Sequence, residues 1–143
     1  MILADTSAWI EFDRATGSPL DNRLTELIAT TDEIAVTEPV IMEVLAGARD
    51  DRRESDLRRL MQRFPLMRFD ATIDFDAAAR IYRRCRRSGV TPRGMVDCMI
   101  AAVALRHDAT LLASDTDLDR VADVMGIPME PHQHGQRRSA LLT

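Results

Sequence analysis

The chain has 143 residues, of which 45% are hydrophobic and 4% aromatic, so it can form one domain with a mainly aliphatic core. Its formal net charge of -4 argues against a protein that attracts nucleic acid through its overall charge. All 19 basic residues are arginine, and the absence of lysine excludes P-loop nucleotide hydrolases and argues against aspartyl-phosphate enzymes and receiver domains.

Short apolar runs alternate along the chain with longer segments of helical periodicity, an order typical of an α/β protein with a parallel sheet. The apolar runs predict short strands at 2–4, 34–36, 66–69, 110–113 and 127–129. The segments between them predict a short helix around Trp9 and longer helices at 19–30, 38–48, 51–63, 73–88, 95–107 and 117–125. We therefore expect a three-layer α/β/α fold around a central parallel sheet of four to five short strands.

Particular residues mark the ends of several predicted helices. Thr6 or Ser7 is expected to cap the first helix, Ser18 the second and Thr37 the third, because their hydroxyl groups accept hydrogen bonds from backbone N–H groups. Gly126 follows the last predicted helix, where glycine commonly ends a helix in the left-handed conformation.

Nothing in the sequence divides the chain internally, so we expect one domain over residues 1–130 and a polar C-terminal tail over 131–143. Cys85 and Cys98 lack the spacing of a disulfide framework or a metal site, which indicates a reducing compartment. The longest apolar run, 98–105, is far shorter than the ~18 residues that cross a membrane. The N-terminus lacks the basic start of a signal peptide, so the sequence predicts a cytoplasmic protein without membrane contact.

One aspartate interrupts the most apolar helix. Residues 95–105 are apolar on every side except at Asp97, and a buried carboxylate is unfavourable unless a cationic group meets it. Asp5 and Asp115 come shortly after predicted strands, and Glu43 lies one to two turns into the helix that follows the second strand. The carboxyl ends of parallel strands meet at one edge of the sheet, so we expect these four acids to converge there.

Each acid also has a structural explanation. Asp5 can cap a helix, Asp97 can favour the helix dipole, Glu43 can pair with an arginine, and Asp115 and Asp117 can be turn or capping residues. Brought together, however, the acids repel one another, and a hard cation such as Mg²⁺ or Mn²⁺ is a simpler counter-charge than arginine. Such an ion lowers the pKa of a bound water and stabilises charge on a phosphoryl oxygen, so phosphodiester hydrolysis with one or two ions is the natural reaction class.

Four segments carry these acids in a distinctive order: Asp5-Thr6-Ser7, Glu43-Val44-Leu45-Ala46-Gly47, Arg93-Gly94-Met95-Val96-Asp97-Cys98-Met99-Ile100-Ala101-Ala102 after Gly89, and Ser114-Asp115-Thr116-Asp117. Together they resemble the PIN-domain ribonucleases, and most closely the VapC toxins of type II toxin–antitoxin pairs. The resemblance extends over residues 1 to about 129 and implies a PIN-like nuclease domain over residues 1–130. It also implies Mg²⁺-dependent endonucleolytic cleavage of structured RNA, often tRNA or ribosomal RNA, with Mn²⁺ able to substitute.

The resemblance also assigns roles to individual residues. It implies that Asp5, Glu43, Asp97 and Asp115 are catalytic and bind metal, with Asp117 as a supporting metal-binding acid. Leu118 and Ser114 depart from the residues that the family often has there, so the choice between Asp115 and Asp117 as the fourth ligand stays open.

Two more residues and two partners follow from the same resemblance. Ser7 matches a small hydroxyl position near the metal, and Arg93 matches a basic residue that commonly precedes the third acid. Members usually form homodimers and are held inactive by a cognate antitoxin. The negative pocket further suggests that the antitoxin places an arginine among the acids.

Local positive charge is needed if an acidic protein acts on RNA. Two groups of arginines share predicted helix faces: Arg80, Arg83, Arg84 and Arg87 with Arg86 beside them, and Arg52, Arg59 and Arg63. The first group is the better candidate for substrate binding, and a solvated helix face is the alternative. A histidine pair, His132 and His134, can chelate a metal ion but is given no catalytic role.

Two other functions remain open from the sequence. One is a different metal-dependent phosphoester hydrolase, such as a DNA nuclease or a phosphatase. The other is a catalytically silent domain of the same fold that binds RNA or a protein.

Overall fold

The computed structural model describes residues 1–132. At its centre lies a parallel sheet of three short strands in the order β2–β1–β3, formed by β1 (Ile2–Ala4), β2 (Ile34–Ala35) and β3 (Thr110–Leu112). Leu3 pairs with Ala35 on one side and with Leu111 on the other. These residues are buried, as expected for a parallel sheet that is covered on both faces.

The sheet is narrower than predicted, because the segments 66–69 and 127–129 do not form strands. Each is reduced to a single parallel bridge, Val36 with Leu66 and Leu111 with Met129. Proline precedes the bridging residue in both segments, at Pro65 and Pro128, and proline cannot donate to a ladder. Among residues 1–132 the sheet therefore has three strands rather than four to five.

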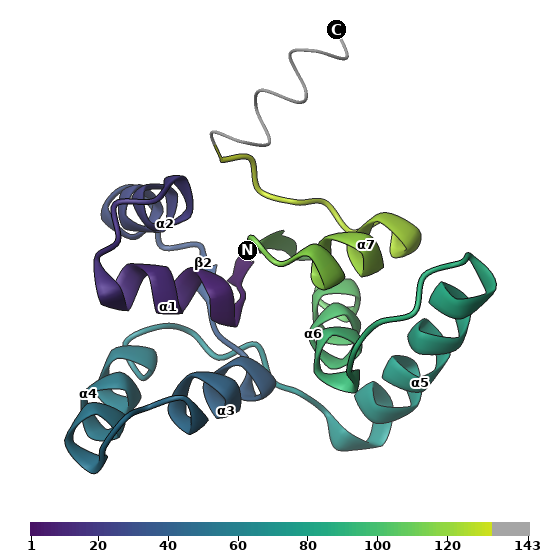
Figure 1. The fold of residues 1–143 in the computed structure, drawn as a ribbon, viewed down its shortest axis with the longest axis horizontal. Helices are drawn as coiled ribbons and strands as arrows, with labels where there is room; N and C mark the ends of the chain where they lie inside the picture. Colours follow the sequence, from purple (N-terminus) through teal and green to yellow (C-terminus); the bar gives the residue numbers. More distant parts are fainter. Residues whose placement is uncertain (133–143) are drawn as a thin grey trace, which may run out of the picture.

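Seven helices surround the sheet over the described residues: α1 (Thr6–Arg14), α2 (Pro19–Thr30), α3 (Glu38–Ala46), α4 (Asp51–Met61), α5 (Ala71–Arg87), α6 (Met95–Arg106) and α7 (Thr116–Met125). Figure 1 shows α1 to α4 on one side of the sheet and α5, α6 and α7 on the other, which confirms the predicted layered α/β architecture. Within this range no helix is long and apolar enough to cross a membrane.

The predicted caps have mixed outcomes. Ser18 accepts a hydrogen bond from the backbone N–H of Asp21, and Gly126 ends α7 with a φ of 71°, both as predicted. The first helix, however, is capped by Asp5 rather than by Thr6 or Ser7. Thr37 holds the N-cap position of α3 without a capping bond, and its buried hydroxyl has no hydrogen-bond partner among the described residues.

Helix α6 is buried along most of its length, as its composition predicts, and an unpredicted ion pair joins it to α5. Asp74 is 0% exposed and accepts hydrogen bonds from Arg106 Nε at 2.9 Å and Nη2 at 2.7 Å, and from the backbone N–H of Asp70 at 2.8 Å. Burial raises the pKa of Asp74, but the hydrogen bonds from Arg106 and Asp70 outweigh it and hold the pKa below its usual value.

We expect Arg106→Met to lower the free energy of unfolding by about 3 kcal/mol, because it leaves the buried Asp74 carboxylate without its counter-charge. The matched control is Arg80→Met, which removes an exposed pair with Asp76 and is expected to change stability by less than about 1 kcal/mol. Urea unfolding followed by circular dichroism measures both variants. Equal, small losses would show that the buried pair does not secure α5 to α6.

Candidate metal centre

The acidic residues collect at the carboxyl edge of the sheet, where strands end and helices begin. Asp5 follows β1 and caps α1, and Asp115 follows β3 by a short turn and caps α7. Asp97 lies in the first turn of α6, and Glu43 lies in α3, which follows β2. Because the three strands are parallel, the elements that follow them begin at the same edge of the sheet, and the acids lie at that edge.

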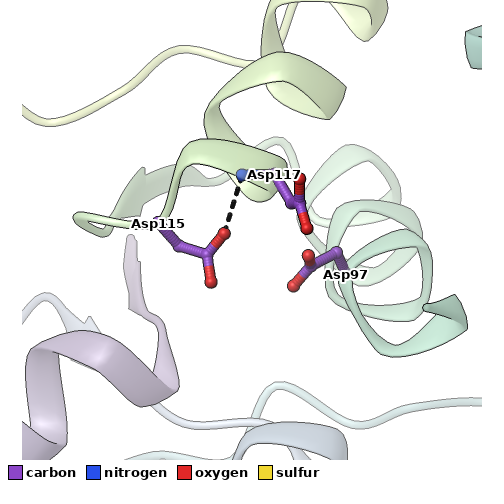
Figure 2. Close-up of side chains that lie close together, drawn as sticks. All are labelled: Asp97, Asp115 and Asp117. Atoms are coloured by element: carbon purple, nitrogen blue, oxygen red, sulfur yellow. Dashed lines mark hydrogen bonds between the residues drawn. The ribbon is translucent and has the colours of Figure 1, made fainter. Parts of the chain in front are cut away.

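Three of the carboxylates form a compact group. One oxygen from each of Asp97, Asp115 and Asp117 lies within 4.8 Å of the others. Figure 2 shows these side chains pointing toward a common space between α6 and the start of α7. Separations of this size suit oxygen ligands around one hard cation better than they suit three uncompensated charges.

Asp5 and Glu43 lie outside that compact group but share its electrostatic environment. The pKa of Asp97 is raised to about 7, first by burial and then by the negative charges of Asp115, Asp5, Glu43 and Asp117. The other four acids named from the sequence therefore all act on Asp97, although only Asp97, Asp115 and Asp117 are within mutual ligand distance.

Asp5 is the most buried of the five, with 3% of its surface exposed. Burial raises its pKa to about 6, and Asp115 adds to the rise. The hydroxyl of Ser7 donates to Asp5 Oδ2 at 3.0 Å, which opposes the rise. Ser7 also accepts a hydrogen bond at 3.2 Å from the backbone N–H of Ser114, so this hydroxyl joins the start of α1 to the turn before α7.

Local donors fix one oxygen of each of three acids. The Ser7 hydroxyl donates a hydrogen bond to Asp5 Oδ2, and the Thr6 hydroxyl donates one to Glu43 Oε1 at 2.7 Å. Backbone N–H groups at the start of α7 donate to Asp115 Oδ1. The sequence analysis missed Thr6 in this role. Its position directly after Asp5 at a helix start was the available signal, because that position places a hydroxyl beside the pocket.

Neither capping nor arginine pairing fully explains the cluster. Asp5 and Asp115 do cap helices, but a cap uses only part of a carboxylate's hydrogen-bonding capacity. Among residues 1–132, the only arginine paired with one of the five acids is Arg93, whose Nε lies 3.4 Å from Asp117 Oδ2. That side chain is 89% exposed, so solvent screens the pair and leaves the inner acids uncompensated.

The residues present fit a hard divalent cation. The donors are carboxylate oxygens, which Mg²⁺ and Mn²⁺ prefer, and neither cysteine nor histidine belongs to the described acidic group. Burial raises the pKa of Asp5 and of Asp97, and neighbouring carboxylates raise both further, so a cation bound there would favour the ionised forms. His132 lies outside the group, and His134 lies outside the described residues.

The predicted arginine face occupies the exposed surface of α5. Arg80, Arg83, Arg84 and Arg87 are all exposed, but only two of them help to line a hollow at the end of the helix. Arg80 pairs instead with Asp76, and Arg86, which was only a flanking residue in the sequence pattern, completes the hollow.

A small parallel sheet between helical layers, with acids gathered at its carboxyl edge, is the arrangement of a PIN domain. The PIN domain family model matches residues 2–124. The chain belongs to the PIN domain family and, within it, to the VapC ribonuclease group.

Curated relatives support this assignment over nearly their full length. Ribonuclease VapC11 of Mycobacterium tuberculosis is 45% identical over 128 residues, which cover 89% of this chain and 96% of the relative. A VapC ribonuclease of Mycobacterium bovis matches to the same extent. Ribonuclease VapC32 of M. tuberculosis is 32% identical over 132 residues, covering 90% of this chain and 96% of the relative.

Solved structures of more distant proteins share the fold. VapBC2 of Rickettsia felis, bound to a promoter DNA fragment, has a TM-score of 0.71 at 20% identity and covers 93% of this chain and 100% of its own. The M. tuberculosis toxin VapC20 has a TM-score of 0.65 at 19% identity and covers 83% and 93%. At these identities the likeness establishes the fold alone.

The raised pKa values predict how metal binding depends on pH. A divalent cation must displace protons from Asp5 below about pH 6 and from Asp97 below about pH 7, so Mn²⁺ affinity should rise about tenfold per pH unit for each proton displaced. We expect Mn²⁺ affinity to rise most steeply with pH below pH 6, less steeply between pH 6 and 7, and to stay constant above pH 7. Calorimetric titration with Mn²⁺ from pH 5 to 8 measures this profile.

The metal-free protein should show the opposite trend in stability. Both folded pKa values exceed the ordinary 3.8, so between about pH 4 and 7 the folded state binds more protons than the unfolded state, and unfolding free energy falls as pH rises. Asp97→Asn should reduce the fall in unfolding free energy between pH 6 and 7. Asp123→Asn, on the exposed surface of α7, should leave that fall unchanged. An Mn²⁺ affinity independent of pH, or a metal-free stability that increases over this range, would contradict the assignment.

Proposed function

We propose that this protein is a Mg²⁺-dependent endoribonuclease toxin that hydrolyses a phosphodiester bond of structured RNA such as tRNA or ribosomal RNA. The observation that supports it most directly is the convergence of Asp97, Asp115 and Asp117 within 4.8 Å at the carboxyl edge of the sheet. The ribonuclease names of relatives at 45% identity support RNA as the substrate. VapC20, which shares the fold, is described as a sarcin-ricin loop cleaving toxin.

We assign metal binding to Asp97, Asp115 and Asp117, with Asp5 and Glu43 completing the acidic set. When bound, Mg²⁺ or Mn²⁺ would lower the pKa of a water molecule and stabilise negative charge on the phosphoryl oxygens. The inner-lying acids, Asp5 and Asp97, supply charge in a partly desolvated place, where it acts more strongly than in water. Asp115 and Asp117 both belong to the compact group, so replacing each in turn with asparagine distinguishes which of them is the fourth ligand.

Residues next to the acids orient them and contact the substrate. Ser7 holds Asp5 Oδ2 and Thr6 holds Glu43 Oε1, so both hydroxyls limit rotation of a carboxylate at the pocket. Arg93 is exposed and only loosely paired with Asp117. Its guanidinium can exchange that partner for a substrate phosphate with little loss of free energy.

A cognate antitoxin and a second copy of the chain are the proposed protein partners. The R. felis VapBC2 and Salmonella typhimurium VapBC structures contain toxin–antitoxin complexes of this fold. We propose that the antitoxin places an arginine among the carboxylates, because the described chain supplies them only with the exposed Arg93. The active form is proposed to be a homodimer.

Replacing Asp97 with asparagine tests the hydrolytic function. We expect Asp97→Asn to reduce Mg²⁺-dependent RNA cleavage by at least about a hundredfold, a barrier increase of about 3 kcal/mol or more, because it removes one charged metal ligand. Asp123→Asn, an exposed change of the same type on α7, serves as the matched control. Cleavage of labelled RNA is followed by gel electrophoresis with and without Mg²⁺.

The substrate panel separates the alternatives. Single-stranded DNA and p-nitrophenyl phosphate are assayed beside RNA, and faster turnover of either would favour a different phosphoester hydrolase. Full RNA cleavage by a folded Asp97→Asn variant would refute the assigned mechanism. Absence of Mn²⁺ binding and of all cleavage in the wild-type chain would favour a silent binding domain.

The Thr6–Glu43 hydrogen bond yields a separate prediction. Thr6→Val should lower Mn²⁺ affinity and kcat each by about three- to tenfold, because Glu43 loses the donor that orients it, a loss on the order of 1 kcal/mol. Thr6→Ser retains the hydroxyl and should restore both values. Calorimetry and cleavage assays measure the two variants, and a Thr6→Val protein with unchanged Mn²⁺ affinity would show that the bond is only structural.

A further inference from the structure

Five arginines occupy the last two turns of α5: Arg80, Arg83, Arg84, Arg86 and Arg87. Like charges three or four positions apart on a helix repel one another. Of these five arginines, only Arg80 pairs with a carboxylate among residues 1–132, that of Asp76. On α4, by contrast, Arg53, Arg58 and Arg59 all pair with acids. The end of α5 is therefore a local concentration of positive charge on an acidic protein.

Three of these arginines line an open hollow at the surface. Arg83, Arg86 and Arg87 line a hollow of about 500 Å³. The guanidinium carbon of Arg86 lies 5.9 Å from the centroid of the Tyr82 ring, a cation–π contact that restricts the side chain. Sites that hold small organic groups measure roughly 300–1,000 Å³, so this hollow has room for a nucleotide-sized group rather than a single small ion.

The hollow lies on the same half of the molecule as part of the acidic cluster. Residues 88–94 connect the end of α5 to the start of α6, which carries Asp97, and Figure 1 shows this connection running back toward α6. Seven residues reach at most about 25 Å. Arg93 lies within this connection and contacts Asp117, so the segment that leaves the arginine-rich end of α5 also brings a basic residue to the acids.

We propose that the hollow lined by Arg83, Arg86 and Arg87 binds the phosphate backbone of the RNA substrate at a position several nucleotides from the bond that is cut. This inference rests on the proposed ribonuclease function. The planar fork of a guanidinium matches phosphate oxygens two at a time, and a polyanion that spans the connection would contact the hollow, Arg93 and the acidic centre together. Backbone contacts of this kind set affinity and position rather than sequence choice.

The test measures RNA binding without cleavage. In an Asp97→Asn background, Arg83, Arg86 and Arg87 are all replaced with glutamine, and binding of a labelled RNA is followed by fluorescence anisotropy at several salt concentrations. We expect at least a tenfold weaker affinity at low salt. A plot of log affinity against log salt concentration has a negative slope, and each phosphate contact to a single strand contributes about −0.7 to it. Loss of three contacts should therefore make the slope less steep by about 2.

Two control variants make the result specific. Arg52 and Arg59 of α4 and Arg63 just after its end, replaced together with glutamine, remove the same net charge elsewhere and should change affinity much less. The same three α5 positions replaced with lysine keep the charge but lose the fork geometry, and should retain most of the salt dependence while binding more weakly. Thermal unfolding of each variant verifies that α5 remains folded.

The outcomes separate the hollow from the active site. Unchanged affinity and salt slope in the folded glutamine variant, or an equal loss in the α4 variant, would overturn the proposal even if wild-type RNA cleavage is intact. Unchanged RNA affinity combined with lost binding of the antitoxin would overturn it in favour of a protein site. Loss of RNA binding as predicted, in a protein whose wild type cleaves no RNA, would support the hollow and refute the nuclease function instead.

Discussion

The mutual repulsion of carboxylates at one edge of a small sheet is the constraint on which this structure depends. Three parallel strands end at that edge, and the elements that follow them bring Asp5, Glu43 and Asp115 to the same place, while α6 adds Asp97. Burial raises the free energy of ionising Asp5 and Asp97, and the negative charges of neighbouring acids add to the effect at both. Among residues 1–132 only the exposed Arg93 offers a counter-charge to this group, so the arrangement suits a cation supplied from outside that part of the chain.

Charge on the other half of the molecule is arranged in the opposite way. Helix α5 begins with acids, one of which, Asp74, is buried and paired with Arg106, and it ends with arginines that mostly lack carboxylate partners among the described residues. The arginine that pairs with the buried Asp74 lies on α6, whereas the exposed arginines lie at the end of α5. The formal net charge of -4 does not reveal that acidic and basic residues lie on different parts of the surface, because an acidic total is compatible with a strongly basic local surface.

Much of the layout could be predicted from the sequence because it depends on local patterns. The uniformly apolar composition of α6, the Ser18 cap and the Gly126 stop each involve nearby residues, and the buried helix, the cap and the helix end were predicted correctly. The strands at 66–69 and 127–129 were wrong, because their apolar composition suited a sheet edge while the prolines before the bridging residues limit pairing there. The Thr6–Glu43 bond and the Asp74–Arg106 pair join residues 37 and 32 positions apart. The position of Thr6 after Asp5 places its hydroxyl near the acids, but the sequence does not identify Glu43 as its partner, nor Arg106 as the partner of Asp74.

Two of the clustered acids also begin helices, so a substitution at either position changes both the charge of the cluster and the start of a helix. Asp5 and Asp115 accept backbone hydrogen bonds at the starts of α1 and α7. Asparagine caps a helix about as well as aspartate, whereas alanine destabilises it by about 1 kcal/mol. Replacement of either residue with asparagine is therefore expected to preserve the start of its helix while removing the charge, whereas replacement with alanine also weakens the helix start.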